Sequence, residues 1–439
     1  MPKLAFALTT LLLLSCATLS PVSGVFFPDA TSPATSTDLP SITPTPFIER
    51  DIAAIGTDGN LYLTDISGNA IPITSGAQAD HRFYQYPSWS PDGSRLAYHS
   101  TGVGGDSLMV YNPEQGTYSE IFRSSTESVV YHYWSPDNRH IAFLSAGPGE
   151  FIRTLWWGEE GQPAEILSTG WPYYWAFSPD GGQVLAHRYG GPPWGQVAIL
   201  DPHLDNPEFE PLVLSPAYFQ APTFLPSGAE FVAAGMDFEG RTTIMRINAE
   251  DFEDRRVIYK GYGEIAFGLS YEGRFLALID NRQLPGDALS GPIALVDMDT
   301  NETIWVRQEL NAIAFFWAPS ANRLAIFSVP DVEDDMQSYK SPHRARLAEN
   351  VGLTLTVLHL GENNPRPVTT QFLPSLAFLE VLRNFDQYQH SAELWAPDSE
   401  SMLLSGQPLG GDLGVWQFDV NGLVSPSYIF NGVLAFWAP

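Results

Sequence analysis

Three things are scarce in this sequence of 439 residues: cysteine, positive charge and long apolar runs. The chain has one cysteine, Cys16, so no disulfide can form within it. Lysine and arginine number 22 against 50 aspartates and glutamates, which gives a formal charge of −28 at pH 7. A chain this acidic cannot owe affinity to the neutralisation of phosphates, so we expect neither nucleic acid nor a bare anionic lipid surface as a partner.

The apolar run at the N-terminus, from Leu4 to Leu14, follows Lys3 and precedes Ser15 and Cys16. At about 1.5 Å per residue such a run is too short to cross roughly 30 Å of hydrocarbon, and its flanks are typical of an export signal. We therefore predict that residues 1–15 are a signal peptide that is removed on export.

The segment Leu-Leu-Ser-Cys that ends at Cys16 resembles the bacterial lipobox, which implies lipidation of this cysteine. The competing interpretation is an incidental cysteine of the apolar region. Residues 16–50 are otherwise rich in serine, threonine and proline, a composition that cannot bury a core, and we interpret them as a disordered tether. The predicted location is the bacterial cell envelope, on the periplasmic or extracellular face, with the lipid anchor as the only membrane contact.

Aromatic residues make up 13% of the chain, so a packed core is expected after the tether. From residue 51 onward one pattern recurs, in which a tryptophan or similar residue precedes Ser-Pro-Asp-Gly or a degraded copy and then an alternating apolar run. The copies begin at Trp89, Trp134, Phe177, Phe224, Leu269, Trp317 and Trp395, and a last fragment ends near Trp437. Most intervals lie between 42 and 48 residues, and one, from Trp317 to Trp395, is 78 residues.

The repeated motif has a mechanical explanation. Pro91 suits the second position of a type I turn, Asp92 the third, and Gly93 the left-handed conformation that completes a bulged hairpin. Two further β-prone runs follow in most units, such as residues 107–112 and 118–124. Four strands in a period of about 45 residues are typical of a β-propeller blade.

The hairpin resembles the WD-repeat-like propeller repeat of TolB and of the propeller domains of prolyl oligopeptidase-type enzymes. The resemblance covers nearly all of residues 51–439 and implies an all-β propeller, with a binding role in the envelope as in TolB-type propellers. Two departures argue against direct equivalence with TolB, because we expect eight blades where TolB has six, and a tether replaces TolB's N-terminal domain. The copies at Phe224, Leu269 and Trp317 also lose parts of Pro-Asp-Gly.

We predict eight blades, one of them a composite of the two chain ends. The strand Ile52–Ile55 lacks an inner neighbour, and the last strand, with Phe436 and Trp437, lacks a blade of its own. Pairing the two closes the ring and leaves no exposed edge. Seven blades are the alternative, if the copy near Leu269 forms no blade.

Two insertions account for the long interval, residues 329–352 and 371–391. The second places Phe378, Leu382 and Phe385 on one helical face, with Pro374 suited to the first turn. We expect this helix to lie over one mouth of the central channel.

The loops that lead into the inner strands are aromatic and polar, and their side chains are the candidate ligand-binding residues of a central funnel for an extended peptide or a sugar chain. The competing interpretation is that most of them pack between blades. The candidates are Asp80, His81, Arg82, Tyr84, Tyr86, His132, Trp171, Tyr173, Tyr174, Tyr218, Gln220, Gln389 and His390. The repeated tryptophans are expected to be structural instead, since one position in every unit serves the repeat; they are Trp89, Trp134, Trp317, Trp395 and Trp437.

No catalytic motif, metal-ligand spacing or cofactor motif is found. The nearest approach to a nucleophile elbow surrounds Ser270, but its glycine spacing is wrong and it lies on a degraded repeat hairpin. The histidines lack metal-site spacing, and the acidic residues 331–335 lack the turn glycine of a calcium loop, so we expect no metal.

These features favour a monomeric, non-catalytic binding or scaffold module for an envelope protein, a peptide or a glycan. The alternative is an extracellular hydrolase or lyase acting on polysaccharide or peptide in the funnel, marked by two carboxylates roughly 5 to 9 Å apart, one with a pKa raised by burial. A third hypothesis is a solute-binding or sensor lipoprotein gated by the helix near Phe378.

Overall fold

The computed structural model describes residues 51–147, 152–188, 195–204, 207–212, 214–218, 220–282, 290–319, 323–329, 352–360 and 366–439. Contacts divide the chain into two compact units, Met1–Phe47 and Ile48–Pro439. The predicted signal peptide, lipidated Cys16 and tether lie outside the described residues. Within those residues no helix is both long and apolar enough to span a bilayer.

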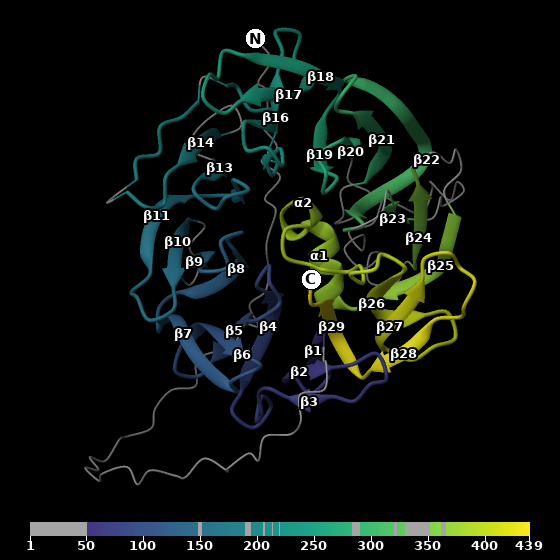
Figure 1. The fold of residues 1–439 in the computed structure, drawn as a ribbon. Coiled ribbons are helices and arrows are strands. Elements are labelled where there is room, and N and C mark those ends of the chain that lie inside the picture. The colour runs from purple at the N-terminus through teal and green to yellow at the C-terminus, as the bar shows by residue number, and fades with distance from the viewer. Residues whose placement is uncertain are drawn as a thin grey trace, which may run out of the picture. The chain divides into compact units, whose positions relative to one another are not determined.

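The second unit consists almost entirely of antiparallel sheets whose strands follow one another along the chain (Figure 1). The first two sheets contain β1 (Ile52–Gly56), β2 (Leu61–Thr64) and β3 (Ile71–Pro72) with the last strand β29 (Gly432–Trp437), and then β4 (Arg82–Trp89), β5 (Leu96–Gly102), β6 (Asp106–Asn112) and β7 (Thr117–Ser124).

Three further sheets follow in the same manner, and the middle one has three strands. They contain β8 (Ser128–Trp134), β9 (His140–Ala146), β10 (Arg153–Glu159) and β11 (Glu165–Gly170); β12 (Tyr173–Phe177), β13 (Val184–Arg188) and β14 (Gln196–Leu200); and β15 (Thr223–Phe224), β16 (Glu230–Met236), β17 (Thr242–Asn248) and β18 (Arg255–Gly261).

The last sheet has ten strands, because β22 continues from the outer edge of one group of strands into the inner edge of the next. Its residues pair with β21 and, from Asn311 onward, with β23. The strands are β19 (Glu264–Leu269), β20 (Phe275–Arg282), β21 (Gly291–Asp297), β22 (Glu302–Trp317), β23 (Arg323–Val329), β24 (Leu353–His359), β25 (Arg366–Pro374), β26 (Ser401–Pro408), β27 (Gly414–Asp419) and β28 (Ser427–Phe430).

The strands thus form eight consecutive groups, with an isolated bridge between Trp395 and Met402 marking the inner strand of the last. The copy near Leu269 supplies β19, which pairs with β20. The number of blades stays a prediction, since hydrogen bonds join the last three groups into one sheet.

The repeated turn forms as its residues predict. Gly93 has φ +68° and its amide donates to the carbonyl of Ser90 at 2.8 Å. The Asp92 carboxylate accepts from the Ser90 hydroxyl at 2.6 Å and from the Ser94 amide at 3.0 Å. The same serine–aspartate bond recurs between Ser178 and Asp180 at 2.6 Å. Where serine and aspartate are present, they satisfy polar groups inside the turn; the copy at Phe224 closes with the same backbone bond, from Gly228 N to Leu225 O at 2.9 Å, without this serine–aspartate pair.

The repeated tryptophans join neighbouring groups of strands. The indole N–H of Trp134 donates to Ser88 O, that of Trp317 to Gly268 O and that of Trp395 to Phe316 O, at 3.0 to 3.1 Å. Each acceptor is the residue just before the motif position of a preceding copy, and all three tryptophans are buried. Trp89 and Trp437 are also buried, and within the described part of the chain their indole N–H groups have no hydrogen-bond partner.

The chain ends pair as predicted. Strand β29 lies antiparallel to β1, with Ile52 opposite Trp437, Ala53 opposite Phe436 and Ile55 opposite Leu434 (Figure 1). The first strand of the sheet thus comes from the end of the chain, and the ring of strands closes through hydrogen bonds between the termini of this unit.

The predicted helix exists as two short helices, α1 (Leu376–Arg383) and α2 (Phe385–Tyr388). Helix α1 begins after Ser375, whose hydroxyl accepts from the Phe378 amide at 3.0 Å. Pro374 belongs to β25 and not to the first helical turn, because Ser375 satisfies the helix N-terminus instead. The other predicted insertion, 329–352, falls between the paired strands β23 and β24, and its residues 330–351 lie outside the described part.

Candidate functional site

The candidate site is the end of the inner strands at which the chain enters them, which we call the loop end; the opposite end, with the repeated turns, is the turn end. Of the predicted ligand-binding residues, two are exposed, eight are partly buried and three are buried. The exposed residues are Asp80 and His81; the partly buried ones are Arg82, Tyr84, Tyr86, Trp171, Tyr174, Tyr218, Gln389 and His390; the buried ones are His132, Tyr173 and Gln220.

Residues 375–392, which we call the central insert, are seated among the inner strands (Figure 1). The Tyr388 ring lies 5.6 Å from the Tyr86 ring of β4 and 4.5 Å from the Tyr131 ring of β8. Phe385 is fully buried, with its ring 4.7 Å from Phe315 of β22. The helix was predicted to lie over one mouth of the channel, and this position stays a prediction. The structure shows that it packs against the inner strands, because these aromatic faces bury one another.

Hydrogen bonds fix the central insert to two inner strands. Gln387 accepts from the Trp175 amide at 2.9 Å and donates to the Trp175 carbonyl at 3.0 Å. The Tyr131 hydroxyl donates to the Gln387 carbonyl at 3.1 Å and lies 2.9 Å from the Ser391 hydroxyl. The Trp175 carbonyl also accepts from the Tyr133 hydroxyl at 3.1 Å. The side-chain amide of Gln387 thus takes the place of a strand neighbour for backbone groups that are buried in the protein.

A third inner strand, β19, also contacts the insert. The Gln389 amide donates to the Phe267 carbonyl at 3.4 Å, and a Cβ atom on Gly268 would lie 2.2 Å from Gln389 Oε1. The absent side chain at Gly268 therefore permits the contact. His390 stacks on the Tyr133 ring at 5.5 Å, so both predicted ligand residues of the insert pack against inner strands.

The buried candidate residues pack against, or form hydrogen bonds with, neighbouring strands. The His132 ring lies 5.5 Å from the His99 ring of β5, and burial lowers the pKa of His99 to about 4 and that of His132 well below its usual range. Both rings are therefore neutral. The side-chain amide of Gln220 donates to the Ala234 carbonyl at 3.3 Å, and the backbone carbonyl oxygen of Gln220 lies 2.8 Å from His187 Nδ1. A ligand reaches His132, Tyr173 and Gln220 only if the packing around them opens.

Among the described residues, no group of three or more histidine, cysteine, aspartate or glutamate side chains is placed to hold a metal ion.

One pair of titratable residues, Tyr271 and Glu393, was not predicted from the sequence. The Tyr271 hydroxyl donates to Glu393 Oε2 at 3.4 Å, and the Glu393 carbonyl accepts from the Trp437 amide at 2.9 Å. Burial raises the pKa of Glu393 to about 7 even though the bond from Tyr271 opposes the shift. Burial, followed by the Glu393 charge, raises the pKa of Tyr271 well above its usual value.

Both members of this pair depart from the repeat. Glu393 stands two residues before Trp395, where the other copies have uncharged or aromatic residues such as Pro87, His132 or Trp175. Tyr271 stands where the other internal copies have proline. These two departures could have marked the pair at the sequence level. They become visible when the repeat copies are aligned against one another.

The comparisons with known proteins concern the fold. No family model and no curated protein matches the chain. Among solved structures it resembles TolB from Acinetobacter baumannii, at 15% identity over 58% of this chain and 65% of that chain, with a TM-score of 0.36. It also resembles a structure from a study of two prolyl endopeptidases, at 11% identity over 81% of this chain and 50% of that one, with a TM-score of 0.50.

A third similar structure is oligogalacturonate lyase in complex with manganese, at 13% identity over 84% of this chain and 95% of that one, with a TM-score of 0.49. The chain spans less than two thirds of the length of the TolB and endopeptidase structures. With the strand pairing, the likeness to the endopeptidase structure supports an all-β propeller fold and nothing further.

Proposed function

We propose that this protein is a non-catalytic, lipid-anchored propeller of the bacterial cell envelope that binds a protein, peptide or glycan partner at its loop end. The observation that carries the proposal is the central insert. Its buried aromatic side chains pack against the inner strands β4 and β22, so we place binding on the surrounding surface.

That surface carries exposed apolar side chains. Because strands alternate in direction, the connections from second to third strand and from one group to the next all lie at the loop end. Single exposed apolar residues need no explanation, but several at one end are typical of an interaction surface. Their positions are Phe83, Val103, Ile152, Phe238, Tyr262, Leu376 and Leu409.

Site-specific photo-crosslinking tests the location of the partner. A photoreactive residue replaces Leu409, 79% exposed at the loop end, or Leu423, 85% exposed at the turn end as the matched control. In intact cells we expect a discrete cross-linked species from position 409 and none from position 423. Equal capture at both positions, or capture at 423 alone, contradicts the proposal.

The lipid anchor has its own test. A Cys16→Ser variant is expected to lose incorporation of labelled fatty acid and to leave the membrane fraction, whereas a Ser15→Ala variant keeps both. Retention of label in Cys16→Ser would place the modification at another residue and contradict the proposed anchor.

The alternative, a hydrolase or lyase, is favoured by one observation. Glu393, whose pKa is raised to about 7 by burial, has the pKa of a general acid or base that works near neutral pH. Its recorded partner is the Tyr271 hydroxyl and not a second carboxylate. Turnover of a polysaccharide or peptide by the wild-type chain, abolished in Glu393→Gln, would replace the binding proposal with this one.

A further inference from the structure

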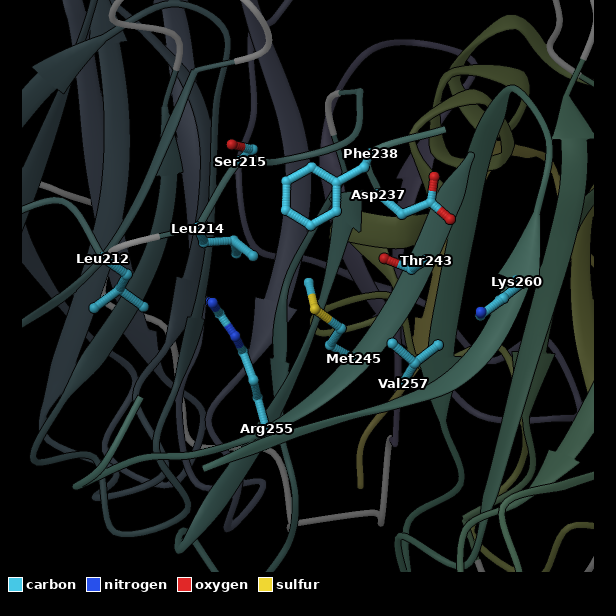
Figure 2. A pocket seen from close by; sticks show the side chains of 10 residues that line it. All are labelled: Leu212, Leu214, Ser215, Asp237, Phe238, Thr243, Met245, Arg255, Val257 and Lys260. Carbon is cyan, nitrogen blue, oxygen red and sulfur yellow. The ribbon is translucent and has the colours of Figure 1, made fainter. Parts of the chain in front are cut away.

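A groove opens at the outer strands β17 and β18, away from the central insert. Its volume is about 480 Å³, within the range of small-molecule sites. Figure 2 shows Leu212 and Leu214 on one side, and Met245 and Val257 between the two basic side chains Arg255 and Lys260. Phe238, which is fully exposed, stands above the groove in this view.

The groove lies beside a sheet in which the described residues form three strands, β12 to β14. After β14 the described part of the chain bonds to its own sheet from Leu212 N to Val197 O, and then crosses to β16, where Met236 N donates to Ser215 O. The outer part of the β17–β18 face is therefore left uncovered. Gly235 deepens the contact, since a Cβ there would lie 2.3 Å from Met245 Cε and 3.1 Å from Leu214 Cδ1.

The charge of the groove opposes that of the chain. Arg255 and Lys260 are both exposed, on a protein with 22 basic and 50 acidic residues. They stand five positions apart on β18, which corresponds to roughly 16 Å along a strand. The acid in the lining, Asp237, is held by Arg241, whose Nε lies 2.8 Å from Asp237 Oδ2. The groove thus offers an apolar strip flanked by two cations.

We propose that this groove binds a long-chain alkyl carboxylate, with the chain along Leu214, Met245 and Val257 and the carboxylate at one end of the strip, beside Arg255 or, in the reversed orientation, beside Lys260. An alkyl chain fits better than a peptide, because peptide N–H and C=O groups laid on this strip would lose water without gaining partners. The proposal does not depend on the function proposed for the loop end.

Calorimetric titration of the full chain with sodium dodecanoate, below its micelle concentration, tests the proposal. We expect one saturable site, with binding weakened about twofold by Arg255→Gln or Lys260→Gln alone, since the other orientation remains, and about tenfold by both. Arg256→Gln is the matched control: the adjacent side chain lies on the other face of β18, and its Nη2 is 3.9 Å from Glu230 Oε1. This variant is expected to bind as the wild type does.

Two further arms separate the groove from adventitious binding. Val257→Trp fills the apolar strip at an exposed position and is expected to abolish binding while the thermal midpoint stays within about 2 °C of wild type. Dodecyltrimethylammonium, with the same tail and opposite charge, is expected to bind at least tenfold more weakly. Absence of a saturable site, equal affinity for both detergents, or unchanged binding in Val257→Trp each overturns the proposal.

Discussion

Replacing Glu393 by glutamine tests the titratable pair at the turn end. Burial raises the pKa of Glu393 from 4.5 to about 7, so between these pH values the folded chain keeps a proton that the unfolded chain releases. The free energy of unfolding therefore falls as pH rises through this window. The difference, 7 − 4.5 = 2.5, sets an upper limit of about 3.4 kcal/mol on the effect.

Glutamine keeps the shape and hydrogen bonding of the neutral acid and does not titrate. We expect wild type and Glu393→Gln to differ little in urea unfolding at pH 4, and the variant to be more stable by as much as about 3 kcal/mol at pH 8. Identical pH profiles of the two proteins would refute the reasoning.

A control of opposite sign is available in Glu400. This carboxylate is exposed, and its hydrogen bond from Arg323 Nη2, at 2.9 Å, lowers its pKa below 4.5. Its contribution to stability is present above the pKa of the unfolded chain and is lost as pH falls, so Glu400→Gln is expected to destabilise at neutral pH and not in acid.

Two further substitutions test the packing of the central insert, both read by chemical denaturation. Phe385→Ala removes a fully buried ring and is expected to lower the free energy of unfolding by about 3–5 kcal/mol, whereas Leu376→Ala, at a residue 71% exposed, changes it by less than about 0.5 kcal/mol. Gln387→Leu leaves both the amide and the carbonyl of Trp175 without this partner and is expected to cost about 2–4 kcal/mol; an effect below about 0.5 kcal/mol would show that water replaces these bonds.

The strands and the turns were predictable because local chemistry specifies them, and the closure because an unpaired edge strand needs a neighbour. In the first copy, Asp92 accepts hydrogen bonds inside the turn and Gly93 takes its positive φ. A copy with the same residue types is expected to form the same turn, so one copy predicts the others. The unpaired first strand likewise required the last one, since a ring of sheets cannot leave an edge open.

The interior of the loop end was not predictable, because it depends on contacts between distant residues. The Tyr131 hydroxyl meets the Gln387 carbonyl across a sequence separation of 256 residues, and nothing near either residue marks the pair. The aromatic and histidine residues of the inner strands, such as His132 of β8, are equally suited to a ligand funnel and to packing. Only the position of the central insert shows that several of them pack.

The positions of the turn end, the loop end and the central insert all depend on the closed ring. Hydrogen exchange at the last strand tests this closure most directly. Amides of β29 that pair with β1, from Leu434 to Trp437, are predicted to exchange as slowly as those of the inner strand β8. Exchange of the 432–439 segment at the rate of an unstructured peptide, with β8 still protected, would contradict the closure and every placement that follows from it.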